Sequence, residues 1–194
     1  MRGPSLRRAS PTLDAVRVEW VICSDYDLSV PRDETFADVL AANEAYAGAF
    51  PNRGLQARAA QGLAVVTCID SRIEPLTMLG LAPGDAKILR NAGARVTSDV
   101  LRSLILASHL LGVDRVMVIA HSDCRMTGRE DDMHAAVRDA GGPDTRELEF
   151  LATDDQEATV RADVELLRSS PYLAPVQVGG FRYDVETGRV SRIC

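Results

Sequence analysis

Residues 63–67 read Leu-Ala-Val-Val-Thr and residues 116–120 read Val-Met-Val-Ile-Ala, and these two runs decide the fold. Each is short, apolar and rich in β-branched residues, which is typical of a strand buried on both faces of a parallel sheet. Between them the sequence predicts a short helix over residues 75–81, a strand over residues 86–90 and a longer helix capped by Thr97. This β-α-β-α-β alternation predicts an α/β domain with a doubly wound, mostly parallel sheet.

The C-terminal part of the chain adds helices and two further strands. A helix is expected over residues 130–140, and a capping box at residues 153–156 is expected to open another. Residues 176–183 and 189–193 predict two strands about a turn, which gives a C-terminal hairpin at the sheet edge. The whole pattern predicts about five strands flanked by helices.

The N-terminal part has a different character. Residues 1–33 show no sustained period, which predicts a poorly structured extension before a single domain over residues 34–194. From Thr35 on, apolar residues follow the spacing of an amphipathic helix, with Asp33 as its cap and Pro51 as its stop. The residues of this stripe are Phe36, Val39, Leu40, Asn43, Tyr46 and Phe50. Its apolar side chains need a surface to cover them.

Composition excludes several classes of protein. A chain of 194 residues with 46% hydrophobic residues can bury one sizeable core, which favours one compact domain. The net charge of −6 argues against nucleic acid as a partner. No apolar run reaches the length of about 18 residues that a membrane-spanning helix needs. Because Lys87 is the only lysine, Schiff-base catalysis is nearly excluded.

The cysteines bear on the compartment. The short apolar stretch near the N-terminus fails as a signal-peptide core, so a cytoplasmic protein is expected, although the Arg- and Ser-rich start leaves a transit peptide open. In a chain without an export signal, widely spaced cysteines favour thiols or metal ligands over disulfides. The four are Cys23, Cys68, Cys124 and Cys194.

A cluster of metal-ligating residue types follows the two buried strands. Cys68 comes directly after the first and His121 directly after the second, and the carboxyl ends of parallel strands face the same crevice. Cys124 lies three residues beyond His121, close enough for both to bind one ion. Any one of these residues alone is more often a packing residue, but their joint placement favours a metal site. Two thiolates and an imidazole suit tetrahedral Zn²⁺, with one position left open as in catalytic sites.

Two charged residues accompany the first cysteine. Asp70 lies two residues beyond Cys68, and Arg72 follows it. The carboxylate could lie beside the metal while the guanidinium binds it in a bidentate pair. The alternative is a loop ion pair that caps the next helix.

The pattern Cys68-x-Asp70-x-Arg72 followed by His121-x-x-Cys124 resembles the β-class carbonic anhydrases. The resemblance covers about residues 35–193. It implies Zn²⁺ held by Cys68, His121 and Cys124, with Asp70 and Arg72 as a catalytic dyad. It also implies reversible hydration of carbon dioxide to bicarbonate and a proton, by a zinc-bound hydroxide that the dyad orients.

The family resemblance carries two further expectations. The segment Arg90-Asn91-Ala92-Gly93 is similar to a loop that lines the family's active site, which implies a substrate pocket at Asn91, Ala92 and Gly93. A homodimer or a dimer-based oligomer is also implied, in which an N-terminal helix packs on the partner subunit. That packing would cover the apolar stripe that begins at Phe36.

One residue departs from the family pattern, and two alternative functions stay open. Family members often carry Gly after the second cysteine ligand, where this chain has Arg125, which either forbids a positive φ there or adds a cation near the metal. The same zinc site would also suit hydrolysis of carbonyl sulfide or carbon disulfide. A structural or redox-sensing zinc protein, with Asp70 as the fourth ligand, is the alternative outside enzymes.

Overall fold

The computed structural model describes residues 35–194, which fall into two units, residues 35–51 and Asn52–Cys194. The predicted extension over residues 1–33, with its Cys23, lies outside the described residues, and the boundary at residue 34 stays a prediction. The first unit contains helix α1 (Ala37–Gly48). Phe36 occupies its N-cap without a side-chain hydrogen bond, so the helix begins later than a cap at Asp33 would require. No residue of α1 is buried.

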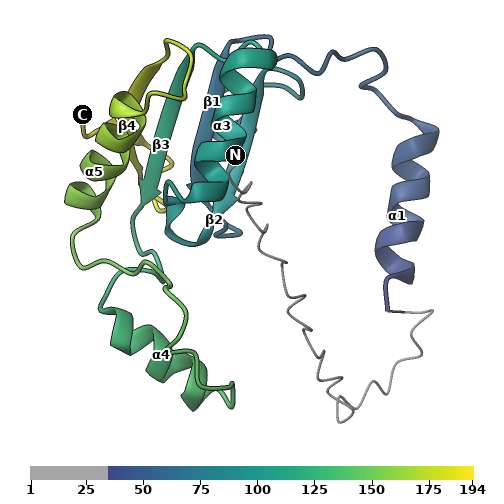
Figure 1. Cartoon of the computed structure of the whole chain (residues 1–194). Helices are drawn as coiled ribbons and strands as arrows, with labels where there is room; N and C mark the ends of the chain where they lie inside the picture. The colour runs from purple at the N-terminus through teal and green to yellow at the C-terminus, as the bar shows by residue number, and fades with distance from the viewer. Residues whose placement is uncertain (1–34) are drawn as a thin grey trace, which may run out of the picture. The chain divides into compact units, whose positions relative to one another are not determined.

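The second unit is built on a five-stranded sheet (Figure 1). Its strands, in the spatial order β2-β1-β3-β4-β5, are β2 (Ala86–Asn91), β1 (Leu63–Cys68), β3 (Arg115–His121), β4 (Gln177–Tyr183) and β5 (Val190–Arg192). The first four pair in parallel, and β5 pairs antiparallel with β4. The predicted mostly parallel sheet with a C-terminal edge hairpin is confirmed.

The α-helices of this unit follow the predicted order, and one 3₁₀ turn that was not predicted lies among them. They are α2 (Pro75–Met78), the 3₁₀ turn η1 (Ala92–Ala94), α3 (Ser98–Leu110), α4 (Glu130–Asp139) and α5 (Gln156–Ser169). None of the helices among residues 35–194 has the length and apolar character that a membrane span requires.

The starts of the two longest helices have local causes. Thr97 caps α3 as predicted, because its side chain accepts a hydrogen bond from the backbone N–H of Val100. Helix α5 is capped by Asp155, whose carboxylate accepts from the N–H of Ala158 at 2.9 Å. The predicted capping box placed the cap two residues early, at Thr153. The hydroxyl of Thr153 instead accepts from the N–H of Asp155.

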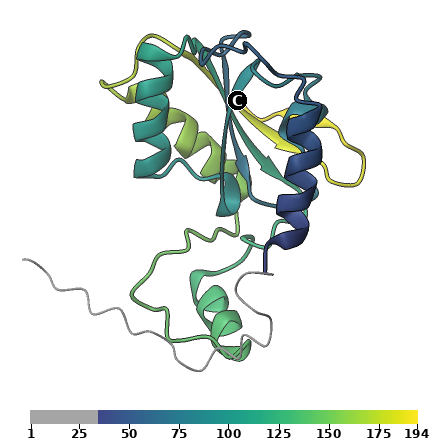
Figure 2. The same ribbon diagram turned by 90° about the vertical axis from the view of Figure 1, so that its right-hand side faces the viewer.

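Helices α3 and α5 lie on the same face of the sheet (Figures 1 and 2). They bury apolar side chains against the central strands, among them Leu104, Val164, Leu167, Val66 and Val118. On the other face, Leu63, Val65 and Ile119 pack with Met78, Leu79 and Leu81 of α2 and the turn after it. Burying one valine or isoleucine side chain contributes about 1.5–3 kcal/mol, so burial on both faces fixes β1 and β3 firmly.

The segment between β3 and α5 leaves the sheet and returns to it. It carries α4, which both views show apart from the sheet (Figures 1 and 2). Backbone hydrogen bonds join the two ends of this segment. The N–H of Gly128 donates to the Thr153 carbonyl at 2.9 Å, and the N–H of Thr153 donates to the Met126 carbonyl at 3.0 Å. The Glu130 carboxylate accepts from the N–H groups of Phe150 and Ala152. These contacts hold the loop that follows β3.

Candidate metal centre

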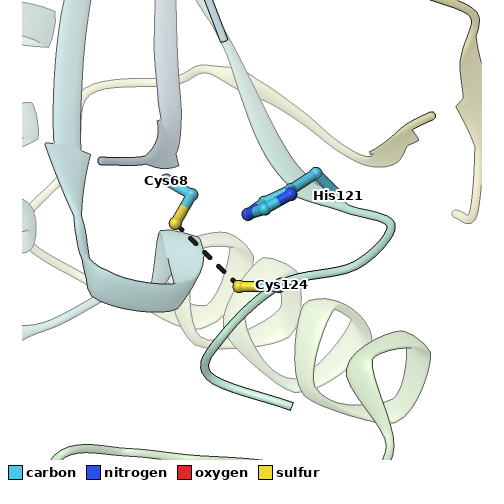
Figure 3. Close-up of side chains that lie close together, drawn as sticks. All are labelled: Cys68, His121 and Cys124. Carbon is cyan, nitrogen blue, oxygen red and sulfur yellow. Dashed lines mark hydrogen bonds between the residues drawn. The ribbon is translucent and has the colours of Figure 1, made fainter. Parts of the chain in front are cut away.

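Three buried donors converge at the carboxyl ends of β1 and β3. One ligand atom each from Cys68, His121 and Cys124 lies within 4.8 Å of the others. The two sulfurs are 4.0 Å apart, with the His121 ring beside them (Figure 3). The three residues are 4%, 1% and 7% exposed. The structure thus brings together the three residues that the spacing predicted as a metal-binding group.

The sheet register explains this convergence. Strands β1 and β3 are adjacent, with Thr67 opposite Ile119, so both chains leave the sheet side by side. After β3 the backbone turns at Asp123, whose φ is +52°, and this left-handed turn precedes Cys124. From η1, the turn that follows β2, the N–H of Gly93 donates to the Cys68 sulfur at 3.4 Å.

The imidazole of His121 provides a test of whether a metal fits. Its Nδ1 lies 2.9 Å from the Ser122 carbonyl and donates to it. Its Nε2 is the only buried side-chain nitrogen or oxygen in residues 35–194 without a hydrogen-bond partner. Such a buried orphan costs about 1–3 kcal/mol. A neutral imidazole held by a carbonyl at Nδ1 presents its Nε2 lone pair to a metal, so the donor set fits a divalent ion.

The two thiols share one proton. The hydrogen bond from Cys124, with the nearby His121 imidazole and the Gly93 N–H, outweighs burial and holds the pKa of Cys68 well below its usual range. The same hydrogen bond, together with burial, raises the pKa of Cys124. Burial lowers the pKa of His121, but its attraction to Cys68 outweighs this and the net shift is upward. A metal would therefore replace the proton that Cys124 keeps.

Asp70 and Arg72 form the bidentate pair that the sequence predicted. Asp70 Oδ1 accepts from Nε of Arg72 at 3.0 Å and from its backbone N–H at 2.9 Å, and Oδ2 accepts from Nη2 at 2.8 Å. These bonds hold the pKa of Asp70 well below its usual range. The Asp70 carboxylate is not part of the three-donor group.

An open cavity of about 1030 Å³ lies beside the site. Its wall includes Asp70, Arg72, Cys124, Arg125 and Arg182. Arg125 is not among the residues with positive φ, which agrees with the first of its two predicted consequences. It also lies on the cavity wall, so the cation of the second is present there.

Comparison with known proteins places the chain in a family. The sequence model described as carbonic anhydrase matches residues 63–190. Beta-carbonic anhydrase 1 of Mycobacterium tuberculosis is 33% identical over 160 residues, which cover 80% of this chain and 96% of that protein. The chain belongs to the β-class carbonic anhydrase family.

Two further relatives of this carbonic anhydrase family member bear on fold and substrate. The crystal structure of a carbonic anhydrase from Streptococcus mutans superposes with a TM-score of 0.75 and 37% identity, and covers 82% of this chain and 97% of that one. A carbon disulfide hydrolase from Acidianus sp. is 32% identical over 153 residues, which cover 66% of this chain and 75% of that protein.

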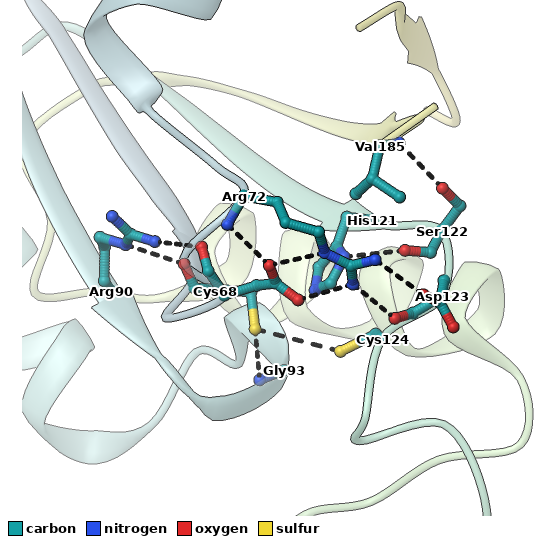
Figure 4. A network of polar contacts seen from close by, with 10 residues as sticks. Cys68, Arg72, Arg90, Gly93, His121, Ser122, Asp123, Cys124 and Val185 are labelled. Atoms are coloured by element: carbon teal, nitrogen blue, oxygen red, sulfur yellow. Dashed lines mark hydrogen bonds and ion pairs between the residues drawn. The ribbon is translucent and has the colours of Figure 1, made fainter. Parts of the chain in front are cut away.

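Two residues of the site make contacts that sequence reasoning did not predict, although Arg90 belongs to the segment that the family resemblance singled out (Figure 4). Asp123 binds Arg72 through its carboxylate, at 2.7 Å from Nη1, and through its carbonyl, at 2.9 Å from Nη2. Arg90 donates to the carbonyls of Cys68 at 2.9 Å and Asp70 at 2.7 Å. No spacing rule links residues 51 positions apart, so only the fold reveals the contact between Asp123 and Arg72.

The predicted substrate loop lies against the cluster from the side of β2. Asn91 exchanges hydrogen bonds with the backbone of Arg95, accepting at 2.8 Å and donating at 2.7 Å. Gly93 has a φ of +78°, a left-handed conformation that brings its N–H to Cys68 and that glycine adopts without strain. Neither Asn91, Ala92 nor Gly93 lines the open cavity beside Asp70. Their role in substrate binding stays a prediction.

Proposed function

We propose that this protein catalyses the reversible hydration of carbon dioxide to bicarbonate and a proton, with Zn²⁺ held by Cys68, His121 and Cys124. The observation that carries the proposal is the buried convergence of two thiols and an unpartnered imidazole nitrogen. Without a bound metal, the buried Nε2 of His121 has no partner. A metal ion held by both sulfurs would provide that partner. Family membership and the neighbouring Asp70–Arg72 pair add support.

Zinc is the ion that the donor set favours. Two thiolates and one imidazole are soft to borderline ligands, which suit Zn²⁺ better than Mg²⁺ or Ca²⁺. When bound, zinc acts as a Lewis acid that lowers the pKa of a coordinated water from 15.7 to about 7 and so supplies hydroxide near neutral pH.

Asp70 orients the reacting water. Arg72 keeps the carboxylate ionised by lowering its pKa, so Asp70 can only accept hydrogen bonds. By accepting the water's O–H, Asp70 directs an oxygen lone pair toward the carbon of carbon dioxide. One water and one carbon dioxide give bicarbonate and a proton, and the proton leaves through the open cavity.

The cavity wall suits an anionic product. Two carboxylates on this wall, Asp70 and Asp123, are both paired with Arg72. Arg125 and Arg182 also line the wall, so bicarbonate formed beside Cys124 passes these two cations on its way out. Carbon dioxide and other uncharged apolar substrates gain nothing from these cations, so only a charged product is affected by them. The wall therefore supports hydration of carbon dioxide over reactions that release only neutral products.

Assembly and compartment belong to the same proposal. The side chains of Phe36, Val39 and Leu40 are 65%, 55% and 62% exposed, and a partner subunit that covers them would give the dimer or dimer-based oligomer. The thiols at the cluster are free and buried, and they need reducing conditions, which supports the cytoplasm.

Hydrolysis of carbon disulfide is the second candidate, because a relative 32% identical carries that name. Both substrates are linear triatomic molecules attacked at carbon. The test is stopped-flow hydration of carbon dioxide beside hydrogen sulfide release from carbon disulfide, both on protein with zinc measured per chain. Fast hydration with no sulfide release supports the proposal, whereas sulfide release without hydration overturns it.

A further inference from the structure

Arg72 is bonded to two aspartates that come from different segments of the chain. Its guanidinium donates to Asp70 through Nε and Nη2, and to Asp123 through Nη1 and Nη2. We propose that Asp123 is a positioning residue, which fixes Arg72 to the loop of His121 and Cys124 and so keeps the Asp70 carboxylate clear of the metal ligands. This inference rests on the proposed function and adds a third member to the pair of Asp70 and Arg72.

The bond between Asp70 and Arg72 alone leaves the position of the pair undetermined. The two residues are two positions apart, so all their mutual hydrogen bonds are local and could move together as one unit. Asp123 lies on the other segment, next to Cys124 and two residues after His121. Its two bonds are therefore the ones that tie the pair to the cluster (Figure 4).

The backbone beneath the pair is held from the opposite side. Arg90 donates to the carbonyls of Cys68 and Asp70, so the main chain of this loop is anchored to β2. The freedom that is left lies in the side chains of Asp70 and Arg72. Because the side chains of Arg72 and Asp123 are 45% and 80% exposed, hydrogen bonds rather than burial hold them in place.

The backbone of Asp123 is shaped for this contact. Its φ of +52° is a left-handed conformation that most side chains disfavour and that Asp and Asn tolerate best after Gly. In this conformation both the carboxylate and the carbonyl of Asp123 face the guanidinium of Arg72. A loop that only had to turn would be served as well by glycine.

The same φ supplies two clean variants. Asp123→Asn keeps a hydrogen-bonding oxygen and the tolerance for left-handed backbone, but removes the charge. Asp123→Gly keeps the turn and removes the side chain altogether. A structural role in the turn predicts that both variants behave as wild type, whereas positioning through the carboxylate predicts a graded loss.

The test combines carbon dioxide hydration with azide binding to the cobalt(II)-substituted protein, read from its visible spectrum. Asp123→Gly should lower kcat/KM by about threefold to tenfold, and Asp123→Asn by less, since exposed charge pairs contribute modestly. Azide affinity should fall by the same factors, because a released Asp70 carboxylate competes for the metal. Thermal unfolding with cobalt bound checks that both variants fold.

An Asp70→Asn background separates the interpretations. There, adding Asp123→Gly should leave azide affinity unchanged, because no competing carboxylate remains. The inference is overturned if azide affinity is the same in wild type and Asp123→Gly, or if the loss persists in the Asp70→Asn background. Absence of hydration in wild type would instead contradict the proposed function, and the azide series would still decide the role of Asp123.

Discussion

The same internal ion pair forms in two segments of this chain, Asp70-Ser71-Arg72 and Asp144-Thr145-Arg146. In each, the arginine binds the aspartate two residues before it. In the second, Asp144 accepts from the Arg146 backbone N–H at 3.1 Å and from Nε at 2.9 Å, and Nη2 lies 2.5 Å from its other oxygen. In both, the arginine holds the pKa of the aspartate below its usual range. Each pair is therefore a local contact between residues two positions apart. The spacing alone does not ensure it, because Asp123 and Arg125 are also two positions apart and Asp123 pairs with Arg72 instead.

What differs is the surroundings. Asp70 follows a strand whose last residue, Cys68, belongs to the buried donor cluster, and Arg72 is held by Asp123. Arg146 is paired only with Asp144 among the ion pairs of the described residues, and both side chains are exposed. The comparison teaches that residues two positions apart can form the pair without help from the rest of the fold, whereas the ends of β1 and β3 make it part of a site.

The largest expected effect comes from removing the cluster that distinguishes the two pairs. Cys124→Ser and His121→Ala should each reduce zinc well below one per chain, with activity falling by at least about a hundredfold. The melting temperature should also fall, since the metal joins segments far apart in sequence. Metal analysis and calorimetry check this, with Cys194→Ser as the matched control. Full zinc content in Cys124→Ser would show that the ligand set is wrong.

The next effect isolates the carboxylates. Asp70→Asn should lower turnover by about tenfold to a hundredfold, because an amide can present N–H₂ where the reacting water needs an acceptor. Asp144→Asn removes the same charge from the same local geometry and should change turnover by less than about twofold. Steady-state hydration rates at equal zinc content measure both. Equal effects of the two substitutions would refute the assigned role of Asp70.

A third comparison replaces the arginine of each pair with alanine. Arg72→Ala should cut hydration by about tenfold while zinc stays bound, because the freed Asp70 carboxylate can reach the metal. Arg146→Ala should leave the rate within about twofold of wild type. Zinc content measured beside activity separates loss of orientation from loss of metal. Unchanged activity in Arg72→Ala would favour the structural-zinc interpretation.

The smallest effect concerns a carboxylate held by backbone N–H groups. Burial raises the pKa of Glu130, but the hydrogen bonds from the N–H groups of Ala152 and Phe150 lower it by more, so the net shift is downward. Its stabilising contribution is therefore present above the unfolded pKa of about 4.3 and is lost as pH falls through the lower folded value. Glu130→Gln should cost about 0.5 kcal/mol or less at neutral pH, given partial exposure. Denaturant unfolding should show the difference vanish in acid; a constant difference would contradict this account.

Much of the fold was predictable because its signals are local. The runs at residues 63–67 and 116–120 are buried on both faces, and Thr97 caps α3 as expected. The cluster was predictable for a related reason, since parallel strands must end at the same edge of a sheet. The two helix starts that differed, at Ala37 and Gln156, depend on which of several candidate caps the backbone adopts.

The contacts that tie the site together could not be predicted. Asp123 and Arg90 reach Arg72, Cys68 and Asp70 across long sequence separations, through side chains whose direction depends on the turn at Asp123 and the register of β2. A residue type alone does not specify such a partner. The three Asp-x-Arg segments make the same point, because spacing alone does not reveal that Asp70 and Asp144 bind their own arginines whereas Asp123 binds Arg72.

The most direct test of the account is the stopped-flow rate of carbon dioxide hydration by the wild-type protein carrying one zinc per chain, measured from about pH 6 to about pH 9. Because Arg72 keeps Asp70 ionised throughout this range, the rate should rise as a coordinated water ionises, through about pH 7 to 8. The account predicts catalysis well above the buffer rate, with Cys124→Ser close to it. A zinc-loaded wild type no faster than the buffer, or a Cys124→Ser variant as fast as wild type, would contradict the central claim.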